Sequence, residues 1–76
     1  MDGAKLNKLA GANIRRMRKS AGWTQEALAA EANVELRYLG SVERGQANPS
    51  LNILARIAKV LRCHPSALLS EGKSRS

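Results

Sequence analysis

The sequence predicts an all-α fold, a compact five-helix bundle formed by a single domain of 76 residues. Three observations support this. Apolar residues recur at three- and four-residue steps, residues that cap helices precede most of these runs, and no strand pattern appears. Because so short a chain has room for only one core, we expect one domain over residues 1–76. Its core should span about residues 5–69, and residues 70–76 should form a frayed tail.

The first helix is expected over about Lys5–Ser20. Asp2 is a candidate N-cap, and Gly22 is a natural stop after the apolar series. Gly11 inside this run costs about 1 kcal/mol relative to alanine, so we expect early fraying there. The apolar residues that define the buried face are Leu6, Leu9, Ala10, Ile14, Met17 and Ala21.

Two short helices follow, over Gln25–Ala32 and about Glu35–Glu43. Thr24 can cap the first of them. Asn33 tolerates the left-handed backbone that a tight turn requires. Two such helices joined by a three-residue turn form a helix-turn-helix, whose second helix enters the DNA major groove with its free face. Its buried face is expected to contain Leu39 and Val42.

The last two helices are expected over about Leu51–Leu61 and Pro65–Leu69. Pro49 excludes a helix from the preceding loop. Ser50 is a good N-cap, and Pro65 suits a first helical position because it has no N–H to leave unpaired.

The charge balance indicates a polyanionic partner, either nucleic acid or an anionic membrane surface. The chain has 13 Lys and Arg against 6 Asp and Glu, a net charge of +7. A single cysteine, Cys63, excludes an internal disulfide and makes the cytoplasm the expected location. No apolar run approaches the roughly 20 residues that a membrane span needs. His64, the only histidine, adjoins Cys63, so we expect no enzyme, metal site, cofactor or small-molecule ligand.

Four segments of the chain form a recognisable combination: Asn13–Arg18, Gly22–Ala29, Tyr38–Gly45 and Asn48–Leu51. Together they resemble the phage repressor/Cro (lambda-repressor-like) helix-turn-helix family over about Leu9–Leu69. The run from Glu43 to Leu51 resembles the controller proteins of restriction–modification systems, which are small stand-alone members. The resemblance implies five helices, a homodimer and transcriptional regulation through a palindromic operator.

The resemblance also implies roles for individual residues. Gln25 matches a position that binds a phosphate or a base edge, and Arg44 and Asn48 match loop positions on the DNA backbone. Arg18 and Glu43 match a partly buried ion pair between the first and third helices. Leu36, Arg37, Gly40 and Ser41 match base-facing positions. The candidate DNA-binding residues are therefore Thr24, Gln25, Glu35, Leu36, Arg37, Tyr38, Gly40, Ser41, Arg44 and Asn48.

Several of these residues have alternative interpretations. Arg37 either contacts guanine or is a solvated surface charge, and Tyr38 either contacts a phosphate or packs its ring on the fourth helix. Gly40 either allows DNA to approach the helix backbone closely or is a glycine that arose by sequence drift and has no function. Glu35, where the family usually has Ser or Thr, either pairs with a neighbouring cation or accepts a hydrogen bond from cytosine. Leu36 suits a thymine methyl group, although single exposed leucines are common.

The predicted function is sequence-specific regulation of transcription by a homodimer that binds a palindromic operator. The dimer interface is expected at the end of the fourth helix and in the fifth, with some of its residues filling the monomer core instead. The alternative is a protein-interaction or antitoxin-type module, which predicts an additional partner-binding segment. A single-stranded RNA binder needs exposed aromatic residues, and Trp23 is expected in the core. The interface candidates are Leu61, Cys63, Pro65, Leu68 and Leu69.

Overall fold

The computed structural model describes residues 2–71, and all of its regular secondary structure is helical. Four α-helices are followed by one short 3₁₀ helix: α1 (Gly3–Ser20), α2 (Gln25–Ala32), α3 (Leu36–Glu43), α4 (Leu51–Leu61) and η1 (Pro65–Leu69). The all-α class is confirmed, but the fifth element is a 3₁₀ turn rather than an α-helix. Among the described residues, no helix is long and apolar enough to cross a bilayer.

Three of the α-helices begin directly after their predicted capping residues, so α1 starts at Gly3 rather than at the expected Lys5. Asp2 accepts a hydrogen bond from the Lys5 N–H at 2.8 Å, and Thr24 and Ser50 cap α2 and α4 in the same way. Between α2 and α3, Asn33 takes the left-handed conformation, with φ 57° and ψ 51°. Because asparagine enters this region more readily than most residues, the turn forms without a glycine.

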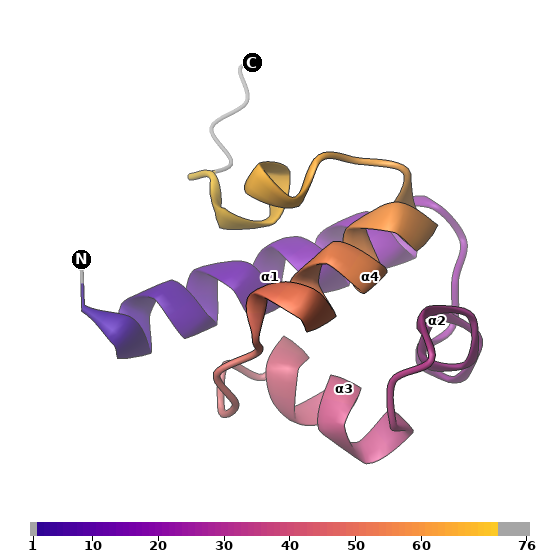
Figure 1. Ribbon diagram of the computed structural model, residues 1–76, viewed down its shortest axis with the longest axis horizontal. Helices are drawn as coiled ribbons and strands as arrows, with labels where there is room; N and C mark the ends of the chain where they lie inside the picture. The colour runs from indigo at the N-terminus through magenta and orange to yellow at the C-terminus, as the bar shows by residue number, and fades with distance from the viewer. Residues whose placement is uncertain (1, 72–76) are drawn as a thin grey trace.

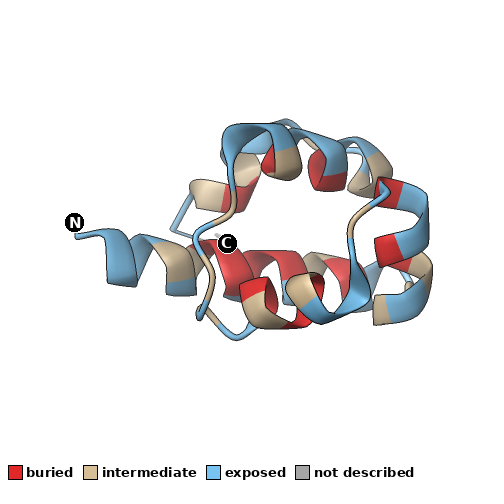
Figure 2. Ribbon diagram, turned by 60° about the horizontal axis from the view of Figure 1, so that its bottom comes forward, coloured by how far each residue is buried: buried red, intermediate tan, exposed pale blue. Residues whose placement is uncertain are grey.

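The elements are arranged in three levels (Figure 1). The long helix α1 and helix α4 lie in the middle, η1 lies on one side of them, and α3 lies on the other. Buried residues face the space between the helices (Figure 2), where Ile14, Leu28, Leu39 and Ile57 are completely buried. This arrangement leaves the outer face of α3 without a covering element.

One residue of the predicted dimer interface, Leu68, belongs to the monomer core. Its side chain is completely buried in the core of its own chain. It therefore fills the monomer, as expected for some members of that set, and has no exposed surface to offer a second copy. The packing of the last element explains why: η1 lies against both α1 and α4, and Leu68 belongs to the core that they share.

Gly11 also corrects an expectation, because it is a close packing position rather than a weak point of α1. It is buried, and a Cβ at this position would collide with the backbone carbonyl oxygen of Val42 and lie 2.8 Å from that of Glu43. Only glycine allows α1 and α3 to approach this closely. The glycine therefore fixes the distance of α3 from the rest of the domain.

Asn13 anchors the end of the described chain, a role that the sequence did not reveal. Its Nδ2 donates to the carbonyl oxygens of Leu68 at 2.9 Å and Ser70 at 2.8 Å, and its Oδ1 accepts from Arg16. The available signal was a polar residue between Ala10 and Ile14 on the apolar stripe of α1. The prediction that the chain frays from residue 70 is therefore wrong for Ser70. Residues 72–76 lie outside the described residues.

Candidate nucleic-acid interface

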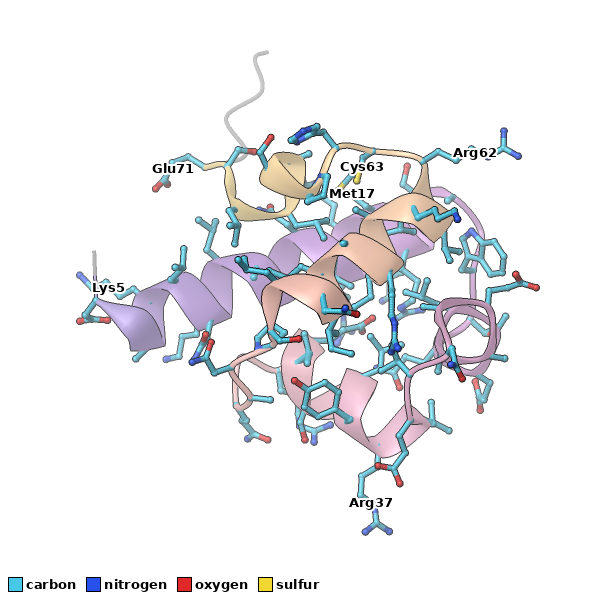
Figure 3. The ribbon with its side chains drawn as sticks, viewed as in Figure 1. Lys5, Met17, Arg37, Arg62, Cys63 and Glu71 are labelled. Atoms are coloured by element: carbon cyan, nitrogen blue, oxygen red, sulfur yellow. The ribbon has the colours of Figure 1, made fainter. Side chains whose placement is uncertain are left out.

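Helix α3 presents two different faces. Leu39 and Val42 are completely buried, whereas Leu36 is 41% exposed and Arg37 is exposed one position later. Figure 3 shows Arg37 pointing away from the rest of the molecule. Since an α-helix repeats every 3.6 residues, the apolar pair anchors one side of α3 and leaves the other side free.

The turn before α3 is held from two directions. Val34 donates its N–H to the carbonyl oxygen of Ala29 at 2.9 Å, and Val34 packs against the core. From α4, Arg56 donates to the carbonyl oxygen of Asn33 at 3.1 Å. These contacts fix the angle at which α3 leaves α2, so the exposed face of α3 is displayed on a rigid support.

A buried ion pair joins α1 to α3, as the sequence predicted. Arg18 donates from Nε to Glu43 Oε2 at 2.7 Å and from Nη2 to Oε1 at 3.0 Å. The Glu43 side chain is only 1% exposed, so its charge depends on this bidentate partner. Arg18 also donates to the carbonyl oxygen of Trp23, which ties in the loop before α2.

Gln25 extends this pair into a three-residue network. Its Nε2 donates to Glu43 Oε1 at 3.0 Å, and the side chain is half-buried at the start of α2. One of the two N–H groups of the Gln25 amide is therefore engaged in the free protein, and a phosphate contact would use the other. The network holds the first turn of α2 close to the last turn of α3.

Arg44 is held over the outer face of α3 by its neighbours. Its Nε donates to Gln46 Oε1 at 3.0 Å, and its Nη2 lies 3.4 Å from Ser41 Oγ. The guanidinium lies above Gly40, where an added Cβ would come within 3.2 Å of Nη1. This explains why Gly40 is buried although it belongs to the outer face. Gln46 was not among the predicted site residues, and its place in the loop is its only signal in the sequence.

The remaining candidates lie around this face in different environments. Thr24 and Asn48 are exposed, and Tyr38 is half-buried with its ring against the core. Glu35 is exposed, forms no capping hydrogen bond, and within residues 2–71 forms no ion pair. Of its two predicted roles, pairing with a cation is therefore not realised in the free protein.

The expected dimer residues other than Leu68 lie partly at the surface. Leu61, Cys63 and Leu69 are half-buried against the core, and Pro65 is exposed. Burial raises the pKa of the Cys63 thiol, which favours its neutral form. Within residues 2–71, no group of three or more His, Cys, Asp and Glu side chains could hold a metal ion.

Comparisons with known proteins agree with this geometry. The chain is 39% identical to the uncharacterized HTH-type transcriptional regulator y4dJ of Sinorhizobium fredii, over 74% of this chain and 73% of that protein. It is also 39% identical to the immunity repressor protein of Bacillus phage phi105, over 80% of this chain but only 42% of the longer repressor. The crystal structure of the restriction-modification controller protein C.AhdI from Aeromonas hydrophila superposes with a TM-score of 0.79 at 35% identity, covering 82% of this chain and 94% of that one.

The family model described as "Helix-turn-helix" matches residues 14–68, a span that includes the buried ion pair, both helices of the motif and most of η1. This span exceeds half of the chain, and the similar proteins above are transcriptional regulators, a repressor and a controller protein. The chain therefore belongs to the helix-turn-helix family of phage-repressor-type transcriptional regulators.

Proposed function

We propose that this protein regulates transcription by binding a palindromic double-stranded operator as a homodimer, with α3 in the major groove. The observation that carries the proposal is the exposed face of α3, displayed by a rigid turn and a buried ion pair. A major groove admits an α-helix and presents a distinct pattern of donors and acceptors for each base pair. The net charge of +7 favours association with the phosphate backbone.

Within this proposal, the outer residues of α3 divide into two kinds. The Arg37 side chain forms no hydrogen bond within residues 2–71 and points outward, so its guanidinium is free to donate twice to a guanine. Arg44 is pre-oriented by Gln46 and Ser41, which suits a phosphate contact that sets the position of the helix. Gln25, Thr24 and Asn48 are assigned to the same positioning role. Leu36 and Ser41 are assigned to base edges.

The orientation of α3 limits which surface serves the dimer. Cys63 and Arg37 lie on opposite sides of the molecule (Figure 3). A two-fold contact through the side that carries Cys63 and Pro65 directs the two α3 helices away from each other. Two half-sites on one face of DNA need both recognition helices on the same side, about 34 Å apart. We therefore favour a contact through the flank of the molecule.

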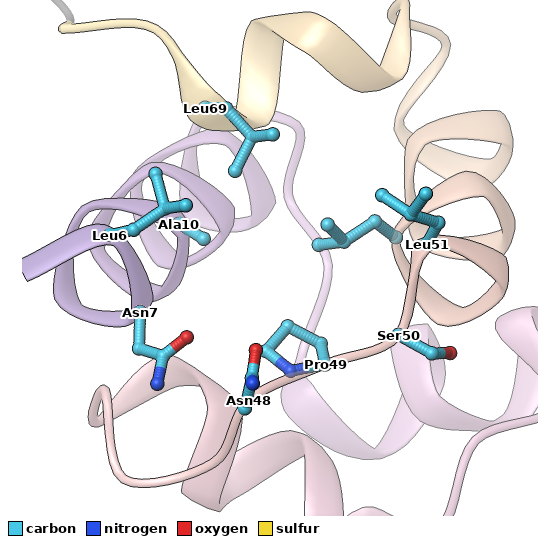
Figure 4. Close-up of a pocket in the computed structure, with 9 residues that line it drawn as sticks. Leu6, Asn7, Ala10, Asn48, Pro49, Ser50, Leu51 and Leu69 are labelled. Carbon is cyan, nitrogen blue, oxygen red and sulfur yellow. The ribbon is translucent and has the colours of Figure 1, made fainter. Parts of the chain in front are cut away.

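A groove of about 320 Å³ provides such a flank, between the start of α1, the loop after α3 and the start of α4 (Figure 4). Leu51 in this groove is 79% exposed, Leu6 is 38% exposed, and Leu69 is half-buried beside them. Exposed apolar side chains gathered on one flank suit a contact between two copies.

The experiment that tests the function is selection of bound duplexes from random DNA by the full chain. The expected result is an enriched inverted repeat whose half-sites are centred about 10 base pairs apart. Enrichment of a single half-site contradicts the homodimer, and no enrichment at moderate salt contradicts sequence-specific binding.

The alternative is a protein-interaction or antitoxin-type module in which the helix-turn-helix is secondary. Its distinguishing outcome is an unenriched DNA pool together with co-purification of one stoichiometric protein partner. The outward-pointing Arg37 favours the DNA-binding function, because a guanidinium with no role in folding or packing suits a base contact.

A further inference from the structure

We propose that a second groove, between α2 and α4, binds an acidic peptide segment of a partner protein that carries large apolar side chains. This groove has a volume of about 710 Å³ and is distinct from both the exposed face of α3 and the apolar flank. Its wall combines Trp23 and Val60 with three cations, Arg56, Lys59 and Arg62, and with one acid, Glu31.

The cations of this groove lack anionic partners within the described chain. Arg56 uses one guanidinium nitrogen on the Asn33 carbonyl oxygen, and within residues 2–71 Lys59 and Arg62 form no side-chain hydrogen bond or ion pair. Glu31 lines the same groove but pairs with none of them. The groove therefore has an excess of positive charge that no group in residues 2–71 neutralises.

Arg62 contributes the third cation of this groove from an uncommon backbone conformation. It follows α4 in the left-handed conformation, with φ 60° and ψ 46°, where glycine is the favoured residue. This conformation closes the C-terminal cap of α4, with the Cys63 N–H donating to the Ala58 carbonyl oxygen at 3.0 Å, and it leaves Arg62 in the wall of the groove. Asn33, the other non-glycine residue in this conformation within residues 2–71, is a residue type that tolerates it.

The chemistry of the groove favours a peptide over nucleic acid. Phosphates need cations but no apolar wall, whereas half-buried Trp23 and Val60 offer a site for an aliphatic side chain between the charges. Glu31 in the same wall can accept a hydrogen bond from a peptide N–H, a donor that a phosphodiester backbone lacks. An acidic segment with interspersed leucines matches both parts of the wall.

The position of the groove allows it to work while the protein is on DNA. Arg62 lies at the opposite side of the molecule from Arg37 (Figure 3), and α2 and α4 form the groove behind the turn that supports α3. The lining contains no residue of α3, although it includes Asn33 of the preceding turn, so we expect a seated partner to leave the outer face of α3 open. The inference is thus separate from the proposed function and is testable without DNA.

Trp23 is the only tryptophan, so its fluorescence reports directly on the groove. The full chain is titrated with a tryptophan-free peptide, Glu-Leu-Asp-Glu-Leu-Asp-Glu-Leu, and with a matched peptide carrying serine at each leucine position. We expect a saturable change in Trp23 emission with the first peptide and at least about tenfold weaker binding of the second. Equal binding of both peptides overturns the apolar part of the site.

Matched charge reversals separate this site from the general charge of the protein. Lys59→Glu is expected to weaken peptide binding at least about tenfold. Lys5→Glu makes the same change in net charge at the far end of α1 (Figure 3), and its effect should be under about twofold. Equal weakening by both variants overturns the proposal in favour of non-specific attraction.

Two further measurements separate peptide binding from loss of fold and from DNA binding. Arg62→Gly is expected to weaken peptide binding while raising the midpoint of thermal unfolding, so weaker binding cannot come from unfolding. Operator DNA should bind Lys59→Glu as well as it binds Lys5→Glu. If Lys59→Glu alone loses DNA affinity, the groove belongs to the DNA surface and the peptide proposal is wrong.

Discussion

At the scale of single residues, the position of α3 depends on two features that are buried inside the domain. One is the Arg18–Glu43 pair, in which both side chains are almost completely buried. The other is Gly11, where α1 meets the backbone of α3. Both act by fixing the position of α3, so changes at either are expected to lower stability before they change specificity.

Glu43→Ala should destabilise the fold by about 3–5 kcal/mol, because it leaves the buried Arg18 guanidinium without its counter-charge. Domains have a free energy of unfolding of about 5–15 kcal/mol, so a loss of this size removes a large part of it. Urea unfolding followed by circular dichroism measures the change. Glu35→Ala, at an exposed position without an ion pair in residues 2–71, is the control and should shift stability by no more than about 0.5 kcal/mol. An unchanged midpoint for Glu43→Ala refutes the structural role of the pair.

Gly11→Ala should also destabilise the protein, by about 1–3 kcal/mol, although alanine is the better helix former. The added methyl group meets backbone carbonyl oxygens of α3, which cannot move aside as a flexible side chain can. Gly3→Ala in the same helix meets nothing within 4 Å and should be neutral or slightly stabilising. Thermal unfolding of the two variants gives the comparison, and equal effects would show that α1 and α3 separate easily.

At the scale of the elements, α3 owes its exposed face to packing on only one side. Leu39 and Val42 face the core, α2 and α1 pack against α3, and η1 lies beyond α1 and α4. Arg37 and Arg44 both extend from this exposed side, but only Arg44 is held by neighbouring side chains of the described chain. The difference predicts different roles on DNA.

Arg37→Ala should remove the preference at one base position per half-site, a loss of about 1–3 kcal/mol on the selected operator with little effect on scrambled DNA. Titration of both duplexes at two salt concentrations measures this difference. If operator and scrambled DNA weaken equally, Arg37 contacts phosphate or nothing, and specificity lies with its neighbours on α3.

Arg44→Ala should instead weaken operator and scrambled DNA alike and reduce the slope of log affinity against log salt by about one. A phosphate contact carries no sequence information, and loss of one cation releases one fewer counterion. The same titrations measure both affinities and the salt slope. A loss of affinity for the operator alone would indicate that Arg44 contacts bases rather than phosphates.

At the scale of the whole molecule, the proposed operator complex needs a surface that joins two copies without turning α3 away from DNA. The apolar groove around Leu51 lies on the flank next to the loop that follows α3 (Figure 4). Cys63, at the end of α4, lies on the far side from Arg37 (Figure 3). Oligomeric state is therefore the measurement that separates these two surfaces.

Leu51→Glu should convert a dimer into a monomer with an unchanged fold, because a charge in an apolar contact is costly to bury. Leu36→Glu, at another exposed large apolar residue, should leave the dimer intact. Sedimentation at tens of micromolar gives both results. A dimer that survives Leu51→Glu but dissociates with a substitution at Leu61 would place the contact at the end of α4.

The helices and their order follow from the sequence alone, because they depend on residues only a few positions apart. The capping roles of Asp2, Thr24 and Ser50 and the turn at Asn33 are local effects of this kind. The family motifs also identified the Arg18–Glu43 pair, and a buried Leu39 follows from helical periodicity. Most of the candidate DNA surface follows from these positions.

Contacts between distant segments became visible only in the folded chain. Gly11 looked like a weak point until the backbone of α3 was found against it, and Asn13 had no evident role until it was seen to bind the carbonyl oxygens of Leu68 and Ser70. The burial of Leu68 and the gathering of Trp23 and Lys59 around one groove were likewise hidden. Local propensity sets which residues form a helix, but the distance and rotation between helices come from the packing of side chains far apart in the chain.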